Sequence, residues 1–170
     1  MSKEGIEWVY HVDKDDNVIG KVDRDEVVKE KLLKRGVLVF VFNSKREILM
    51  HKRTMNKRLY NGYYDIAYGG TVNYGESYDE AAKRELQEET GIKNQELIFL
   101  GNDKYEGEEE RTFVQVYKCI YDGEIEFNPE EVEFGKFISL EELEKKKQTK
   151  TFCPDSIYYF KKYLEEYHGK

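Results

Sequence analysis

The sequence contains little of what several classes of protein need. Its two cysteines, Cys119 and Cys153, are too few and too far apart for a disulfide framework or a zinc cluster, and we expect both to be buried thiols. The histidines His11, His51 and His168 are equally scattered, so neither a histidine-built metal site nor a catalytic triad is expected. With 2 prolines and 13 glycines, the chain does not have the composition of a low-complexity linker.

Long apolar runs are also missing. The longest, Val37 to Phe42, is far shorter than the ~20 residues that cross a bilayer. Met1 to Glu4 lead into no apolar segment with a small-residue cleavage site, so we expect a cytoplasmic protein without a secretory signal or a membrane partner. The net charge of -7 disfavours binding to nucleic acid polymers. An acidic protein of this kind would need metal ions to handle phosphates.

The composition that remains is that of a folded domain. Hydrophobic residues make up 39% of the chain and aromatic residues 14%, which is too much for a disordered segment. A chain of 170 residues corresponds to about one domain, and no internal repeat or change in composition divides it. We therefore expect a single domain over residues 1–170.

The hydrophobic pattern predicts an α+β fold. We expect an N-terminal hairpin over residues 6–22, a short helix over 25–33, and an apolar strand over 36–42 that is buried on both faces. Further strands are predicted at 47–52, 97–100, 112–121 and 132–138, and helices at 140–146 and 155–167, with a loop at 57–64. Hairpins and crossovers alternate in this order, which favours a mixed β-sheet flanked by helices.

One helix has clear signals at both ends. Ser77 and Glu80 have the spacing of a capping box, and Gly91 is placed to end the helix in a left-handed conformation. We therefore predict a helix from Ser77 to Thr90.

A motif overlaps this helix. The spacing is G-x5-E-x7-R-E-U-x-E-E-x-G-U, in which U is an aliphatic residue, and it is formed by Gly70, Glu76, Arg84, Glu85, Leu86, Glu88, Glu89, Gly91 and Ile92. Glu85, Glu88 and Glu89 lie at i, i+3 and i+4, on one face of the helix. Three adjacent carboxylates repel one another unless a hard cation such as Mg²⁺, or Mn²⁺ as its substitute, neutralises them.

The rest of the motif fits a metal site better than a solvated acidic face. Arg84 can hold one carboxylate and fix its direction. Gly69 and Gly70 allow the backbone to approach the metal, where a carbonyl oxygen can be a further ligand. A solvated helix face would need neither the glycines nor the offsets of Glu76 and Arg84.

Residues Gly70 to Ile92 resemble a complete Nudix box, and the order of elements is similar to that of the Nudix α/β/α sandwich. The resemblance implies a hydrolase that cleaves a nucleoside diphosphate linked to another moiety by Mg²⁺-assisted attack of water at phosphorus. It implies metal ligation by Glu88, Glu89 and the Gly69 carbonyl, with Glu85 as a ligand or the general base. Arg84 would orient Glu85.

The resemblance also implies roles around the box. Glu76 would support the junction between loop and helix or the outer shell of the metal ion. A general base or a further ligand can come from a loop outside the box, and Glu131, Glu133 and residues 108–110 are candidates, of which we favour Glu131. Any one of them is more often an ordinary solvated carboxylate.

Two other functions remain open. Residues 8–20 and 152–156 resemble the bacterial Nudix branch that is similar to isopentenyl diphosphate isomerase. The isomerase positions for a cysteine, a tryptophan and a histidine fall at Gly69, Asp155 and near Lys34, so its proton-transfer chemistry lacks central groups. A nucleotide-binding module without catalysis is the second alternative, although such modules usually have incomplete boxes.

The substrate is the least determined feature. Arg53, Lys57 and Arg58 precede the box and could contact phosphates, and Tyr68 could line the pocket of the leaving group. The alternatives are surface cations and a buried aromatic ring. A small-molecule diphosphate is the expected partner, and the protein is expected to be a monomer or a homodimer.

Overall fold

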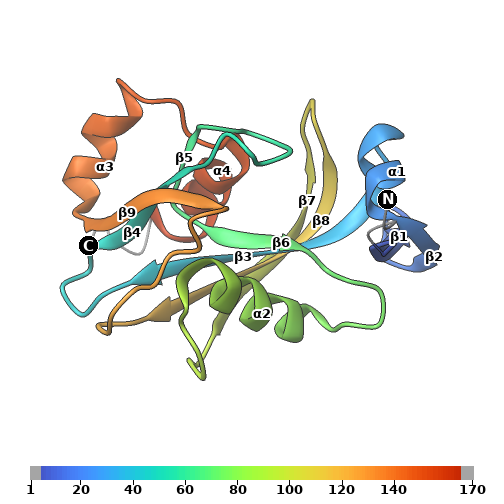
Figure 1. The fold of residues 1–170 in the computed structure, drawn as a ribbon, viewed down its shortest axis with the longest axis horizontal. Coiled ribbons are helices and arrows are strands. Elements are labelled where there is room, and N and C mark those ends of the chain that lie inside the picture. Colours follow the sequence, from blue (N-terminus) through green and yellow to red (C-terminus); the bar gives the residue numbers. More distant parts are fainter. Residues whose placement is uncertain (1–4, 166–170) are drawn as a thin grey trace.

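The structure is a computed structural model that describes residues 5–165. Figure 1 shows the fold of this part of the chain. The strands are β1 (Trp8–Val12), β2 (Val18–Asp23), β3 (Leu33–Phe42), β4 (Ile48–Arg53), β5 (Tyr64–Asp65), β6 (Tyr68–Thr71), β7 (Ile98–Glu106), β8 (Arg111–Ile120) and β9 (Val132–Ile138). The helices are α1 (Arg24–Lys29), α2 (Tyr78–Thr90), α3 (Leu140–Lys147) and α4 (Pro154–Tyr163).

Strand β3 organises the sheet. It pairs in parallel with β8 along its whole length and antiparallel with β1, β4 and β6. Strand β7 continues the sheet beyond β8, while β5 and β9 both pair with β4. The sheet therefore combines parallel and antiparallel pairs, which confirms the predicted mixed β-sheet.

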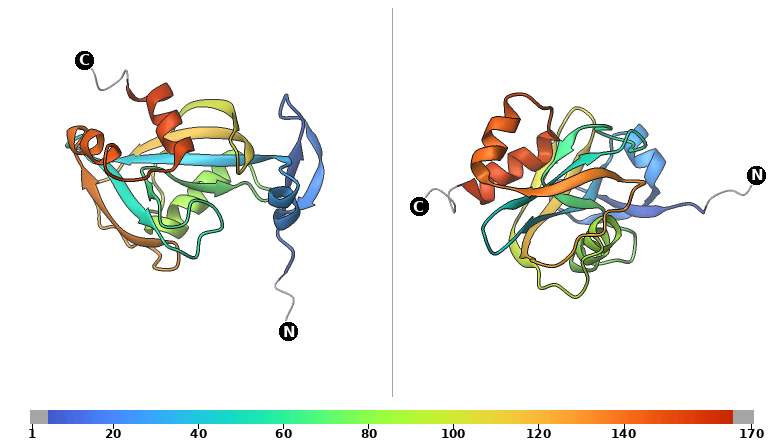
Figure 2. Two further views of the ribbon diagram at one scale, coloured as in Figure 1. Left: turned by 90° about the horizontal axis from the view of Figure 1, so that it is seen from above. Right: turned by 60° about the vertical axis from the view of Figure 1, so that its left-hand side comes forward.

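Helices cover both faces of this sheet. Figures 1 and 2 show α2 on one face and α3 and α4 on the other. Side chains of β3 alternate between the two: Val39 packs in the cluster that contains Ala82 and Leu86 of α2, and Phe40 packs in the cluster that contains Phe160 of α4. This alternation confirms that the strand is buried on both faces and explains its continuous apolar sequence.

The predicted N-terminal hairpin is present as β1 and β2. Val9, Val22 and Val27 of α1 form a small apolar cluster of their own. The hairpin turn is fastened to the main sheet by Arg35, whose Nε lies 2.7 Å from Oδ1 of Asp16. The hairpin and α1 therefore pack together at one end of the molecule and are held to the sheet by this ion pair (Figure 1).

Several element boundaries differ from the predictions. The helix predicted over 25–33 ends at Lys29, and β3 begins at Leu33 rather than at Gly36, because Leu33 already pairs with Arg111 of β8. Strand β6 and the short β5 were not predicted. The strand expected at 97–100 continues as β7 to Glu106, since β8 provides a partner along that length.

The C-terminal helix begins near the predicted position. Helix α4 starts at Pro154 and ends at Tyr163, and positions 166 and 167 of the predicted helix lie outside the described residues. None of the helices within residues 5–165 has the length and apolar character needed to cross a membrane.

Candidate active site

Helix α2 carries three of the acidic residues of the motif, Glu85, Glu88 and Glu89. Ser77 and Glu80 form the predicted capping box, and Gly91 ends the helix with a φ of 73°. Ala81, Ala82 and Leu86 fix the rotation of the helix by packing on the sheet. Glu85 and Glu89 therefore lie at the buried side, with 8% and 1% of their surface exposed, while about half of the Glu88 side chain is exposed.

The backbone of β6 runs between two of these carboxylates. The Gly69 amide donates a hydrogen bond of 3.1 Å to Oε2 of Glu89. A Cβ atom on Gly70 would lie 2.5 Å from Oε1 of Glu85, so the carboxylate occupies the space of the missing side chain. A Cβ atom on Gly69 would clash with the Val37 carbonyl oxygen of β3. Both glycines are therefore needed for close packing.

Arg84 holds the other side of the cluster. Its Nε and Nη2 atoms donate to the two carboxylate oxygens of Glu76, at 2.7 and 3.0 Å, and Nη2 also donates to the Thr71 carbonyl. Its Nη1 atom lies 2.7 Å from Oε1 of Glu85 and 3.4 Å from Oε2 of Glu88. The hydrogen bonds to Glu76 raise the pKa of Arg84, and the guanidinium orients Glu85 as the motif predicts.

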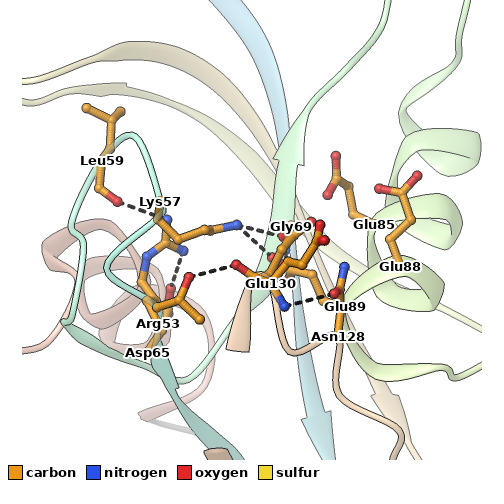
Figure 3. Close-up of polar contacts among 12 residues, drawn as sticks. Arg53, Lys57, Leu59, Asp65, Gly69, Glu85, Glu88, Glu89, Asn128 and Glu130 are labelled. Carbon is orange, nitrogen blue, oxygen red and sulfur yellow. Dashed lines mark hydrogen bonds and ion pairs between the residues drawn. The ribbon is translucent and has the colours of Figure 1, made fainter. Parts of the chain in front are cut away.

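Glu131 joins the cluster from a distant part of the chain. Its loop is anchored because the Asn128 amide donates to the carbonyl at the end of α2, that of Glu89, and Thr54 donates to the Glu131 carbonyl. The Nζ atom of Lys57 lies 2.7 Å from Oε2 of Glu131 and 3.3 Å from Oε1 of Glu89. Figure 3 shows Lys57 extending from its loop toward Glu89, with Glu85 and Glu88 further along α2.

The carboxyl groups of the cluster differ in the direction in which their surroundings shift their pKa. Burial raises the pKa of Glu89 well above its usual value, although Lys57 opposes this effect, and burial also raises the pKa of Glu85 against the charge of Arg84. Burial acts in the same sense on Glu131, but the hydrogen bond and charge of Lys57, with smaller contributions from Glu89 and Arg53, together outweigh it and lower the pKa of that carboxyl. Glu131 is therefore held in its ionised form at neutral pH, the form that can accept a proton.

The donor set fits a hard divalent cation. Carboxylate oxygens are the ligands that Mg²⁺ and Mn²⁺ prefer, and Glu85 and Glu89 flank a bare backbone segment that can bring a carbonyl close. Within residues 5–165, no three His, Cys, Asp or Glu side chains are already gathered as metal ligands. Arg84 and Lys57 hold the carboxylates instead, so ligation would need these oxygens to turn.

A pocket of about 500 Å³ adjoins the cluster. It begins at the Gly69–Gly70 backbone and Glu131 and extends to the start of α4, where Cys153 and Asp155 line it. Its walls also come from α1, β3, β7, β8 and the loop between β4 and β5. A small molecule could thus place one part at the carboxylates and another in the pocket.

Two of the residues predicted to bind the substrate, Arg53 and Arg58, line the pocket but differ in how free their guanidinium groups are. Arg58 lines the pocket and pairs with Asp25 of α1, and half of its side chain is exposed. Arg53 also lines the pocket, but its guanidinium is turned to Asp65 and to the carbonyl groups of Leu59 and Tyr60, which fixes the loop (Figure 3). It is mainly an anchor for that loop in this structure.

The expectation that Tyr68 contacts the substrate is wrong for this structure. Tyr68 is completely buried, its ring stacks on His51 with 4.5 Å between the ring centroids, and its hydroxyl donates to the Leu49 carbonyl. The physical reason is the alternation of β6, because a side chain next to Gly69 points into the layer between the sheet and α2.

The candidate bases outside the box are also separated by the fold. Glu133 pairs with Lys52, and Glu110 pairs with Lys34 in the pocket wall, at 2.8 Å. Only Glu131 of these three reaches Glu89, through Lys57.

Two features of the site are not predicted by the sequence. They are the ion pair between Lys57 and Glu89 and the presence of acidic side chains in the pocket. Asp155 lines the pocket, where burial raises the pKa of its carboxyl to about 7, and Asp65 adds to this effect. Nothing in the local sequence marks either contact, because both depend on segments that are distant in the chain.

Comparisons with known proteins agree with the motif. The family model described as NUDIX domain matches residues 32–158. The chain is 33% identical over 162 residues to the uncharacterized Nudix hydrolase PA4841 of Pseudomonas aeruginosa, covering 95% of this chain and 94% of that protein. It is 28% identical over 151 residues to the uncharacterized Nudix hydrolase YfcD of Escherichia coli, covering 89% of this chain and 83% of that protein.

Solved structures give the same result for the fold. The crystal structure of DR0079 from Deinococcus radiodurans matches with a TM-score of 0.79 and 24% identity, covering 94% of this chain and all of that one. The MutT protein from Methanosarcina mazei matches with a TM-score of 0.66 and 27% identity, covering 80% of this chain and 96% of the other.

Proposed function

The chain belongs to the Nudix domain family and is a hydrolase of the kind that acts on acid anhydrides, and we propose that it is a Mg²⁺-dependent pyrophosphohydrolase of a nucleoside diphosphate linked to another moiety. One observation carries this proposal. Glu85 and Glu89 lie against the bare Gly69–Gly70 backbone, Glu131 lies next to Glu89, and both the glycines and Glu131 line a pocket of about 500 Å³.

The acidic residues divide into ligands and a base. Glu88, Glu89 and the Gly69 carbonyl would hold the metal, with Glu85 as a further ligand or the alternative base. When bound, the metal ion would neutralise the charge of the diphosphate and increase the acidity of water, and Mn²⁺ could take its place.

Side chains of the protein would carry out the proton transfer and position the reacting groups. Glu131 takes one proton from the attacking water, whose oxygen forms a bond to phosphorus while the bridging P–O bond breaks. The lowered pKa of Glu131 keeps it ionised for this task. Arg84 holds Glu85 in place through the hydrogen bonds described above, and Arg58 at the pocket could contact the phosphates.

Isomerase chemistry has less support. Gly69 stands where the isomerase cysteine would fall, and β3 leaves no room for a side chain there. Cys153 does line the pocket, but burial raises the pKa of its thiol, which opposes ionisation.

A panel assay tests the proposal. Nucleotide sugars, dinucleotides, nucleoside triphosphates and prenyl diphosphates are incubated with Mg²⁺, Mn²⁺ or a chelator, and phosphate release is measured through a coupled enzyme. The expected result is chelator-sensitive cleavage of one class of compound, with ¹⁸O from labelled water in a phosphoryl product. Clear ligand-induced thermal shifts without any cleavage would instead identify a binding module.

A further inference from the structure

Lys57 occupies a position that bears on metal binding. Its ammonium lies between two carboxylates, 3.3 Å from Oε1 of Glu89 and 2.7 Å from Oε2 of Glu131. The side chain of Glu89 is 2% exposed and that of Lys57 is 20% exposed, so water neutralises little of this charge. Without Lys57, two carboxylates that are close enough to share a hydrogen bond would face each other without a cation.

We propose that Lys57 is an internal counter-cation that a divalent metal ion must displace in order to bind Glu89. This inference rests on the proposed function, because it assumes that Glu89 is a metal ligand. An ammonium group within hydrogen-bond distance of the same oxygen competes directly with a metal ion. Metal affinity is then reduced by the free energy with which Lys57 holds its two partners.

Arg84, the other cation of the cluster, is not suited to this exchange. Its guanidinium binds both oxygens of Glu76 and also the Thr71 carbonyl, so it has partners outside the proposed ligand set. The Nζ atom of Lys57 contacts only Glu89 and Glu131 among the described side chains. A lysine is a point charge on a flexible stem, and its release breaks no other contact.

The loop that carries Lys57 can stay in place during the exchange. Arg53 binds the carbonyl groups of Leu59 and Tyr60, and the Thr54 side chain donates to the Glu130 carbonyl. These contacts fix the backbone on both sides of Lys57. The four-carbon side chain can therefore turn into the adjoining pocket, which Lys57 already lines.

The test measures metal affinity and not turnover. Binding of Mn²⁺ is followed at pH 8 by electron paramagnetic resonance of the free ion, in the wild type and in Lys57→Met. We expect the variant to bind Mn²⁺ about 5- to 150-fold more tightly, which is the usual range of coupling between two sites. Lys52→Met is the matched control, because Lys52 also pairs with a glutamate, Glu133, but away from Glu89. Its affinity should equal that of the wild type.

A second variant acts in the opposite direction. Lys57→Arg keeps the charge and adds a rigid fork of donors that can bind a carboxylate through two hydrogen bonds, so it should hold the carboxylates more firmly and bind Mn²⁺ more weakly than the wild type. It still tests the proposal if Lys57→Met does not fold. Unchanged or weaker binding by Lys57→Met, or tighter binding by Lys57→Arg, would overturn the proposal. A wild type that binds no Mn²⁺ would instead refute the proposed function itself.

Discussion

The close approach of β6 to α2 depends on the absence of a single atom, the Cβ atom of Gly70. The hydrogen atom of Gly70 faces the carboxylate of Glu85, and a methyl group in its place would force that carboxylate away from Arg84. Gly20 of β2 is a useful contrast, since a Cβ atom there would meet nothing within 4 Å. The two glycines are alike in the sequence and differ only in what the fold brings opposite them.

Gly70→Ala should therefore impair the site more than the fold. A displacement of about 1 Å at a catalytic group can reduce turnover about 100-fold, and we expect a loss of that order for the best substrate of the panel. Gly20→Ala should leave turnover unchanged. Equal activity of the two variants would show that Glu85 does not need its present position.

Glu88→Gln and Glu89→Gln should each lower metal-dependent turnover by orders of magnitude, because each removes a proposed ligand. Burial already disfavours the ionised form of Glu89, and a glutamine oxygen can still accept from the Gly69 amide. The thermal midpoint should therefore stay the same or rise. Glu96→Gln, on an exposed loop after α2, is the control. Full activity of either ligand variant would refute the site assignment.

His51 should make stability depend on pH. Burial lowers the pKa of its imidazole from 6.5 to about 4, and Nδ1 has no hydrogen-bond partner among the described residues. Below pH 6.5 the unfolded chain binds a proton that the folded protein does not, so the free energy of unfolding falls as the pH decreases toward 4. At ~1.36 kcal/mol per pKa unit, the loss is about 3 kcal/mol.

The comparison with His51→Phe isolates this effect. Phenylalanine keeps an aromatic ring against Tyr68 but cannot bind a proton. Asp155, with a pKa of about 7, has the opposite effect, since its stabilisation is lost as the pH rises through 7, but it is common to both proteins. Between pH 7 and pH 5, urea unfolding should show a less favourable change of stability in the wild type than in the variant, and an equal change in both proteins would contradict the prediction.

At the scale of elements, local signals predicted α2 and could not predict β6. The capping box, Gly91 and the apolar face of α2 lie within one short segment, so the helix could be recognised with both ends. The residues of β6 form a strand because Val37 and Leu38 of β3 pair with Gly70 and Gly69. Such pairing is a property of the fold, and two glycines give no strand signal.

The caps of α2 and α3 allow a prediction about the elements themselves. The hydroxyl of Ser77 accepts from the Glu80 amide, and that of Ser139 accepts from the Glu142 amide in the same way. Ser77→Ala and Ser139→Ala should each reduce the free energy of unfolding by about 1 kcal/mol. Chemical denaturation measures both. A loss for Ser139→Ala alone would mean that packing, and not the cap, determines where α2 begins.

The whole molecule gathers carboxylates from segments that are far apart in the sequence. Glu85, Glu88 and Glu89 were recognised together because one helix carries them. Glu131 could be singled out only weakly, because its approach to Glu89 depends on the antiparallel pairing of β9 with β4 and on the loop that precedes β9. The acidic site is therefore a product of sheet topology as much as of the motif.

This gathering of charge predicts how metal ions affect global stability. Glu76, Glu85, Glu88, Glu89 and Glu131 share two cations, Arg84 and Lys57, in a chain with a net charge of -7. A ligand that binds only the folded state at 100 times its Kd stabilises by about 2.7 kcal/mol. For a chain of this size that is a rise of about 5 to 10 °C in Tm.

Differential scanning calorimetry with increasing Mg²⁺ should show this rise, which should grow with the logarithm of the free Mg²⁺ concentration above the Kd and disappear with a chelator. Sodium chloride at equal ionic strength separates specific binding from general screening of the negative charge, because screening acts on the whole surface and depends on ionic strength rather than on a binding site. Glu88→Gln separates the site from the rest of the molecule, since it removes one proposed ligand at a half-exposed position. A rise of the same size in sodium chloride, or in Glu88→Gln, would mean that the acidic surface as a whole, and not the cluster on α2, responds to the metal ion.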